Sequence, residues 1–264
     1  MGKKKALQAL DEEELGFVQE KMRCPFGDAD NYTSLLRLLN YKIQLKCKNE
    51  KQKEFLNQLK NDKYQICFAQ GSAGSGKSFI SIGYALSALK DQSNSFDKII
   101  LLVPTAEAGN MSLGYLKGDL EAKMFPYLEA DKYTMEKILK TSGNVFPKGI
   151  VDNLVQRNLI DFELVNFARG KTFDNALILI CEGENYSPGE LLLLLTRIGD
   201  GSKVIITGDA QQLDRRDIKK TKEGNGLTYA IERLKDLDEV SVTTFTEEDI
   251  VRNPIISKIL KAWA

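Results

Sequence analysis

The chain of 264 residues contains no histidine, and this absence excludes whole classes of chemistry. Without imidazole there is no Ser-His-Asp triad, no Cys-His dyad and no His-ligated zinc site. Any catalysis must therefore use carboxylates, amines, guanidinium groups, amides or hydroxyls. The 37 Lys and Arg residues balance 37 Asp and Glu residues, which argues against a wholly basic coat for nucleic acid.

Cysteines and long apolar runs are also scarce. The cysteines at 24, 47, 67 and 181 form no CxxC pair, a pattern typical of free thiols in a reducing cytosol. The longest run of leucines, Leu191 to Leu195, is far shorter than the ~20 residues that a membrane-spanning helix needs. No signal-peptide core follows the basic residues Lys3 to Lys5. We therefore expect a cytoplasmic protein without a membrane partner and without structural zinc.

From Tyr64 onward, short apolar runs alternate with amphipathic stretches, which predicts an α/β fold with a parallel sheet and helices on both faces. The expected strands are Tyr64–Ala69, Lys98–Val103, Phe162–Val165, Ala176–Ile180, Val204–Thr207 and Val240–Phe245. Apolar side chains recur at helical spacing after Lys77, and Ser187-Pro188-Gly189-Glu190 predicts a capping box with proline at the first helical position. Thr141 to Gly149, rich in Gly, Pro and Asn, predicts a surface loop.

Residues 1–48 differ from the rest because they are charged and show no strand pattern. Their apolar side chains gather in a patch at Leu35, Leu36, Leu38 and Leu39. We expect a short helical N-terminal extension over 1–48 and one domain over 49–264.

The segment Gly71-Ser72-Ala73-Gly74-Ser75-Gly76-Lys77-Ser78 matches G-x-x-x-x-G-K-[ST] at every fixed position. At average residue frequencies, a chain of this length matches by chance about once in a hundred. An expected strand leads in and an expected helix leads out, which is the required strand–loop–helix context. Backbone amides of such a loop hold phosphates, so we expect Lys77 to reach the β- and γ-phosphates of ATP and Ser78 to bind Mg²⁺.

Together with this loop, several further segments resemble segments of one protein family. They are PTAEAG at 104–109, LGYLKGDLEAK at 113–123, FARGKTFDNA at 167–176, LLTRIGDGSKVIITGDAQQLD at 194–214 and DIVRNPIISKIL at 249–260. Together they resemble the PhoH family of P-loop ATPases, relatives of the superfamily-one helicases. The resemblance covers roughly residues 45–262 and implies a RecA-like P-loop domain that binds and hydrolyses ATP. It implies no PIN-type ribonuclease domain, for which the N-terminal extension is too short.

The resemblance assigns roles to two glutamines. Gln52, in Asn49-Glu50-Lys51-Gln52, resembles the helicase glutamine that reads adenine, although an exposed glutamine on a polar helix is an equal interpretation. Gln212, in Thr207-Gly208-Asp209-Ala210-Gln211-Gln212, occupies the position that senses the γ-phosphate. An amide can accept from the attacking water and donate to a phosphate oxygen. A turn-capping amide is the alternative for Gln212.

Arginines are expected because a guanidinium fork stabilises the charge of a transferring phosphoryl group. Arg252 matches the family's arginine near the C-terminus, and Arg169 lies in the ARGKT segment. One would act on its own nucleotide and the other on a neighbour's. Arg197 is a third candidate, which its position after a leucine helix favours as a helix cap.

One departure from the family pattern concerns the metal. Where the family normally has Asp-Glu-Ala-Gln, this chain has Cys181-Glu182-Gly183-Glu184. A neutral thiol is a poor ligand for magnesium. Glu182 keeps the general-base position and is a candidate ligand of Mg²⁺. Asp209 and Glu184 are candidates to supply the negative charge that the thiol at 181 lacks. We therefore expect weakened Mg²⁺ binding with slow hydrolysis, which Cys181→Asp would accelerate.

The residues after Gln52 suffice for one lobe of ordinary domain size, whereas a helicase closes a cleft between two lobes. We therefore expect a homo-oligomer, plausibly a hexameric ring. A basic stretch at Arg215, Arg216, Lys219, Lys220 and Lys222 is the candidate contact for RNA or single-stranded DNA, and another runs from Lys42 to Lys53. For each stretch taken alone, a solvated face is the slightly favoured interpretation. The alternatives are an ATP-dependent assembly or switch protein without nucleic acid, and a small-molecule kinase, which the Gly-Asp-x-x-Gln segment disfavours.

Overall fold

The computed structural model describes residues 40–91, 96–104, 120–212 and 224–251, and the side chains of 120–128 are outside this description. Its strands are β1 Ile66–Gly71, β2 Lys98–Val103, β3 Ile160–Leu164, β4 Ala176–Ile180, β5 Lys203–Gly208 and β6 Val240–Phe245. Its α-helices are α4 Glu50–Lys60, α5 Lys77–Lys90, α6 Leu120–Thr141, α7 Pro147–Gln156, α8 Pro188–Leu195 and α10 Gly226–Leu234. Short 3₁₀ turns follow at η1 Val165–Phe167, η2 Gly183–Asn185, η3 Ala210–Gln212 and η4 Glu247–Asp249.

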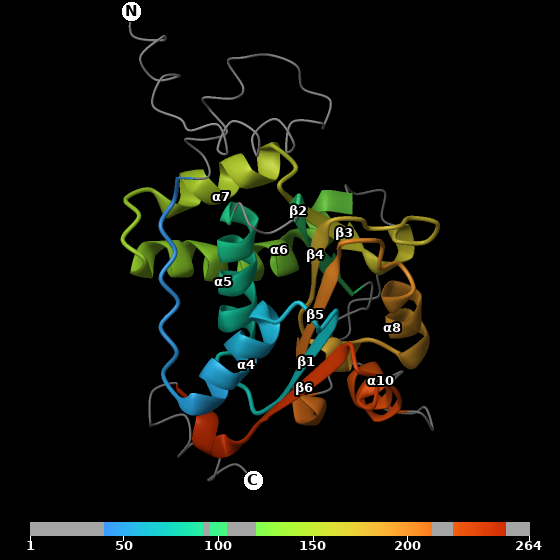
Figure 1. The fold of residues 1–264 in the computed structure, drawn as a ribbon. Helices are drawn as coiled ribbons and strands as arrows, with labels where there is room; N and C mark the ends of the chain where they lie inside the picture. The colour runs from blue at the N-terminus through green and yellow to red at the C-terminus, as the bar shows by residue number, and fades with distance from the viewer. Residues whose placement is uncertain (1–39, 92–95, 105–119, 213–223, 252–264) are drawn as a thin grey trace, which may run out of the picture.

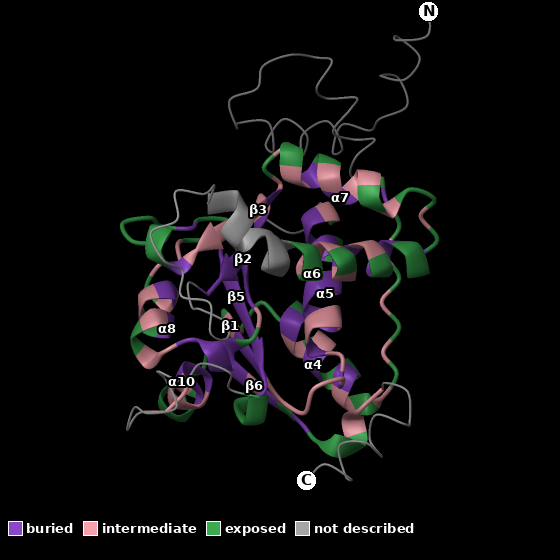
Figure 2. Cartoon of the chain, turned by 180° about the vertical axis from the view of Figure 1, so that it is seen from behind, coloured by how far each residue is buried: buried purple, intermediate pink, exposed green. Residues whose placement is uncertain are grey.

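The six strands form one sheet in the order β3-β2-β4-β5-β1-β6, and every pair is parallel. All six expected strands are present, with ends shifted by up to two residues. β4 and β5 are buried along their whole length, because both faces of a parallel sheet are covered. Figure 2 shows this concentration of buried residues in the sheet.

Helices cover both faces of the sheet, which confirms the predicted fold class (Figure 1). One core cluster joins α4 to α7 with one face, and it includes Phe55, Leu86 and Met135. The other cluster joins α8 and α10 with the opposite face, through Leu191 and Leu227 among others. None of the helices in the described ranges is long and apolar enough to cross a membrane.

Local sequence explains where two of the helices begin. Ser187 caps α8 with its hydroxyl, and the Glu190 carboxylate accepts from the Ser187 backbone N–H, so the expected capping box is present. The predicted loop at Thr141–Gly149 is shorter than expected. α6 continues to Thr141 and α7 begins at Pro147, because a proline is well suited to the first turn of a helix.

Residues 40–48, which we call the N-terminal strap, are not helical as the sequence analysis predicted, and 1–39 lie outside the described residues. The strap is extended, and its side chains alternate between inward and exposed from Tyr41 to Lys48. The Tyr41 hydroxyl donates to the Leu86 carbonyl of α5 at 2.6 Å, and the Gln44 N–H donates to Ser142 Oγ at 2.9 Å. Apolar residues at every second position explain this conformation, since they bury one side of an extended chain.

Candidate functional site

The glycine-rich loop connects β1 to α5, as the motif predicts. Gly71, Gly74 and Gly76 all have positive φ values, which only glycine adopts without strain. A Cβ at Gly71 would overlap the Phe245 carbonyl oxygen, and one at Gly76 would lie 2.7 Å from Gln52 Nε2. The loop backbone is therefore packed closely against β6 and α4.

The start of α5 opens into a small cavity. Gly76 is the N-cap of α5 and provides no side-chain hydrogen bond to the first-turn amides. A cavity of about 160 Å³ is lined on this side by Ala73, Gly74, Gly76, Lys77, Ser78 and Phe79. Backbone donors at a helix N-terminus attract anions, and the volume suits a phosphate tail better than a whole nucleotide.

Lys77 lies inside this loop and is 8% exposed. Its ammonium group donates to the carbonyls of Gly71 and Ser72, the latter at 3.0 Å, and lies 3.4 Å from Ser75 Oγ. The loop's own oxygens thus hold the cation at the cavity. A phosphate that enters would offer Lys77 stronger, charged acceptors in place of these carbonyls.

The facing wall of the cavity is acidic. It consists of Glu182, Glu184, Thr207, Gly208 and Asp209, from the carboxyl ends of β4 and β5. Strands of a parallel sheet bring such residues together at one edge, where α/β proteins bind ligands. A cationic loop therefore faces carboxylates across a space of phosphate size.

Hydrogen bonds tie this wall to the loop. Asp209 Oδ2 accepts from the Ala73 N–H at 3.0 Å, and Glu184 Oε2 accepts from the Asp209 N–H at 2.9 Å. Burial raises the pKa of Glu184 to about 7. Glu182 has a left-handed backbone with φ of +54°, a strained conformation that is common at functional sites.

Comparison with known proteins identifies the family to which this site belongs. The family model described as PhoH-like protein matches residues 44–264. The chain belongs to the PhoH family. It is 34% identical over 219 residues to a PhoH-like protein of Bacillus subtilis (strain 168), covering 83% of this chain and 64% of that protein.

Two other relatives agree. A PhoH-like protein of Synechocystis sp. is 33% identical over 219 residues, which are 83% of this chain and 62% of the relative. Protein PhoH of Escherichia coli (strain K12) is 30% identical over 220 residues, 82% of this chain and 57% of the relative. The chain thus spans about 57–64% of the length of these curated relatives.

Gln52 is buried at the start of α4, beside the glycine-rich loop. It is 3% exposed, so it is not a surface glutamine. Its Nε2 donates to the Ser75 carbonyl at 2.7 Å, and its Oε1 accepts from the Lys48 N–H at 2.7 Å. Gln52 therefore joins the strap to the phosphate loop, and these bonds engage both ends of its amide.

The structure separates the expected catalytic residues. Arg169 is exposed and follows the edge strand β3, which lies four strand spacings, or about 19 Å, from β1. Gln212 is exposed in η3 and does not line the cavity. Arg252 lies outside the described residues, but the N–H of the preceding Val251 donates to the Gly74 carbonyl at 3.1 Å. The chain therefore contacts the loop directly before Arg252.

The basic stretches contribute little to this site in the described residues. Residues 213–223, with Arg215, Arg216, Lys219, Lys220 and Lys222, lie outside the described part of the chain. In the other stretch, Lys51 pairs with Glu54 and Lys53 pairs with Glu50. The exposed lysines of the strap point away from its inward side chains, which is typical of a solvated face.

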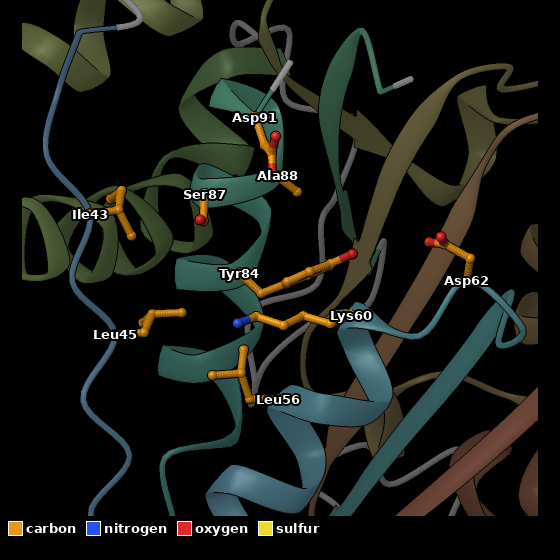
Figure 3. Close-up of a pocket in the computed structure, with 9 residues that line it drawn as sticks. All are labelled: Ile43, Leu45, Leu56, Lys60, Asp62, Tyr84, Ser87, Ala88 and Asp91. Carbon is orange, nitrogen blue, oxygen red and sulfur yellow. The ribbon is translucent and has the colours of Figure 1, made fainter. Parts of the chain in front are cut away.

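A larger cavity, of about 610 Å³, lies away from the phosphate loop (Figure 3). Its lining comes from the strap, α4 and α5 and comprises Ile43, Leu45, Leu56, Lys60, Asp62, Tyr84, Ser87, Ala88 and Asp91. We place the candidate site at the smaller of these two cavities, because there the glycine-rich loop and the start of α5 face acidic side chains.

The sequence analysis did not find Asp131, a half-buried residue of α6. Burial and the nearby Glu182 charge raise the pKa of Asp131 to about 7, while the Cys181 thiol beside its carboxyl group lowers it. Burial, followed by the Asp131 charge, raises the pKa of Cys181. Cys181 is therefore a neutral thiol beside a carboxyl group. One sequence signal existed: Asp131 is four residues before Met135 on the apolar side of α6.

Proposed function

We propose that this PhoH-family protein binds ATP with Mg²⁺ and hydrolyses it. The observation that carries the proposal is the glycine-rich loop of Gly71–Ser78, which faces Glu182, Glu184 and Asp209 across a cavity of phosphate size. The donor set fits the triphosphate, since a loop amide, a helix N-terminus and the Lys77 ammonium all favour negative charge.

The residues at the cavity would divide the work as follows. Lys77 would bind the β- and γ-phosphates, and the Ser78 hydroxyl would bind Mg²⁺. Mg²⁺ would neutralise the charge that develops on phosphate oxygens. Glu182 would accept the proton of the attacking water and contribute charge to the metal site. Mg²⁺ at this site would be held largely by phosphate oxygens and water, as is usual for this ion at nucleotide sites.

The remaining roles concern residues away from the cavity. Gln212 would orient the attacking water, which requires η3 to move toward the phosphates. Arg252 would act on the nucleotide of its own chain, because Val251 contacts the loop. Arg169 would act on the nucleotide of a neighbouring chain, since its own loop is several strands away.

The position of Arg169 supports the proposal of a homo-oligomer, plausibly a hexameric ring, whose subunits complete one another's sites. RNA or single-stranded DNA would be the substrate of this oligomer, with the segment from Arg215 to Lys222 as the contact. The alternative is an ATP-dependent assembly or switch protein with weak hydrolysis, which the thiol at Cys181 favours.

One experiment tests ATP binding and hydrolysis. Wild type and Lys77→Ala are compared by calorimetry with ATP and by phosphate release. We expect wild type to bind and hydrolyse ATP, and Lys77→Ala to lose both while keeping its melting temperature within a few degrees. Hydrolysis that is unchanged in Lys77→Ala would refute the proposed site.

The same assay separates the two functions. Hydrolysis measured with single-stranded RNA, single-stranded DNA or neither should rise with nucleic acid and fall again as salt increases, because phosphate contacts release counterions. Hydrolysis that ignores nucleic acid, together with nucleotide-dependent assembly in light scattering, would instead establish the switch.

A further inference from the structure

The carboxyl ends of β2, β4 and β5 place three residues in one row. Leu102 pairs with Ile180, and Ile180 pairs with Ile206, so the next positions along these strands are Val103, Cys181 and Thr207. Cys181 has the same direction as Leu179, two residues earlier, since side chains alternate along a strand. Leu179 belongs to the core that α5 and α6 cover, and Cys181 therefore faces these helices as well.

α6 presents a continuous side to this face. Met135, Ile138 and Leu139 are each 0% exposed and pack in the same cluster as Leu179. Asp131 precedes Met135 by one turn and thus extends this apolar side toward the row at the strand ends. A carboxyl group in that position meets the sheet instead of solvent.

The side chain that Asp131 meets is Cys181. Burial and the Glu182 charge raise the pKa of Asp131, and the Cys181 thiol beside its carboxyl group lowers it, so all three groups lie close together. No lysine or arginine of the described ranges compensates Asp131 electrostatically. In the nucleotide-free protein this carboxyl group therefore lies at the strand ends without a cation of its own.

Thr207 gives a second, independent indication of a ligand. Thr207 is 2% exposed and lines the cavity opposite the glycine-rich loop. In the described part of the chain, its Oγ1 has no hydrogen-bond partner. The Cys181 thiol beside it is a weak partner at most. A buried hydroxyl without a partner is costly, and water or a hydrated ion in the cavity would satisfy it.

These contacts form a chain from α6 to the cavity. Thr207 lines the cavity, Cys181 adjoins Thr207, and Asp131 contacts Cys181. Two carboxylates in contact repel each other, so only one of the positions 131 and 181 can carry a stable charge. The small, neutral thiol at 181 is what allows the carboxylate at 131.

We propose that Asp131 supplies from α6 the carboxylate that the PhoH pattern places at the end of β4, and that it supports Mg²⁺ at the nucleotide phosphates in place of Cys181. This inference rests on the proposed ATP site and concerns only its metal. It changes the expectation from the sequence: the charge is relocated, and Cys181→Asp alone does not strengthen metal binding.

The test measures metal binding separately from nucleotide binding and from turnover. Mn²⁺ serves as the Mg²⁺ probe, and its binding to the ADP-saturated protein is followed by electron paramagnetic resonance. ADP affinity is measured in parallel by calorimetry with EDTA. The variants are Asp131→Asn, Cys181→Asp and the double exchange Asp131→Asn with Cys181→Asp. Glu129→Gln, an exposed carboxylate on the same helix, is the matched control.

We expect Asp131→Asn to weaken Mn²⁺ binding by about tenfold, the scale for residues that support a metal site. Its ADP affinity in EDTA should stay within about twofold of wild type, which also reports that the variant is folded. The double exchange should restore Mn²⁺ binding, Cys181→Asp alone should bind Mn²⁺ no more tightly than wild type, and Glu129→Gln should match wild type.

Two results would overturn the inference. Mn²⁺ binding in Asp131→Asn equal to that of wild type would show that the carboxylate plays no part. An equal loss of ADP affinity in EDTA would show that Asp131 only maintains the structure. Failure of the proposed function is distinguishable from both, because wild type itself would then bind no ADP.

Discussion

The pH dependence of stability follows from two carboxyl groups near the cavity. Burial raises the pKa of Asp131 from 3.8 to about 7 and that of Glu184 from 4.5 to about 7. Between the unfolded and folded pKa values, the folded state binds more protons than the unfolded state. The stabilising contribution is therefore complete below about pH 4 and is lost as the pH rises through about 7.

The magnitude can be worked from these values. A shift of about 3 pKa units corresponds to about 4 kcal/mol at about 1.4 kcal/mol per unit. The partial exposure of Asp131 and the cavity beside Glu184 admit solvent, which reduces this to about 2 kcal/mol each. The nucleotide-free protein should accordingly lose about 3 kcal/mol of unfolding free energy between pH 5 and pH 8. The loss should be steady up to about pH 7 and level off above it, where both groups are ionised in the folded and the unfolded state.

Urea unfolding at intervals between pH 5 and pH 8 measures this loss. Asp131→Asn and Glu184→Gln should each remove about half of it, and the double variant should be nearly flat. Glu184→Gln keeps an oxygen that accepts from the Asp209 N–H. Glu232→Gln, an exposed carboxylate on α10, is the control and should follow wild type. A double variant as pH-dependent as wild type would refute the reasoning.

Three further substitutions test the packing around the site. Gly71→Ala should lower the free energy of unfolding by more than about 2 kcal/mol and abolish ATP binding, because the added Cβ overlaps Phe245. Gly143→Ala is the control, since Gly143 also has a positive φ but lies in open space, and it should cost about 1 kcal/mol in the same urea unfolding assay. Gln52→Ala leaves the Lys48 N–H and the Ser75 carbonyl without this partner and should lower the free energy of unfolding by about 2–4 kcal/mol. Gln44→Ala, at an exposed glutamine of the strap, should cost under about 0.5 kcal/mol, and equal losses in the two variants would contradict these contacts. Thr207→Val removes an unpaired buried hydroxyl, so the nucleotide-free protein should melt at the same or a higher temperature, and a fall of several degrees would show a missed partner.

The strands and the phosphate loop could be predicted because their signals are local. An apolar run of strand length, followed by glycines and an amphipathic helix, specifies strand, loop and helix with little dependence on the rest of the chain. The loop of Gly71–Ser78 therefore lies where the motif predicts, between β1 and α5. The capping box at Ser187 was predictable for the same reason.

The strap shows a local signal that was present but missed. The residues from Tyr41 to Lys48 alternate strictly between apolar and polar, and the structure buries the apolar side of an extended chain. Judging the segment by its charge obscured this period. Its role in holding the loop through Gln52 required the structure, because an amide's partners do not follow from sequence spacing.

By itself, the amino-acid sequence determined that this protein has a parallel sheet, a glycine-rich loop after the first strand, and a thiol at the end of β4. Only the tertiary structure decided what surrounds that thiol. Asp131 and Cys181 are distant along the chain, and they meet because α6 packs its apolar side on the sheet with one carboxyl group at the end of that side. The placement of one element on another depends on the whole core, which no local pattern encodes.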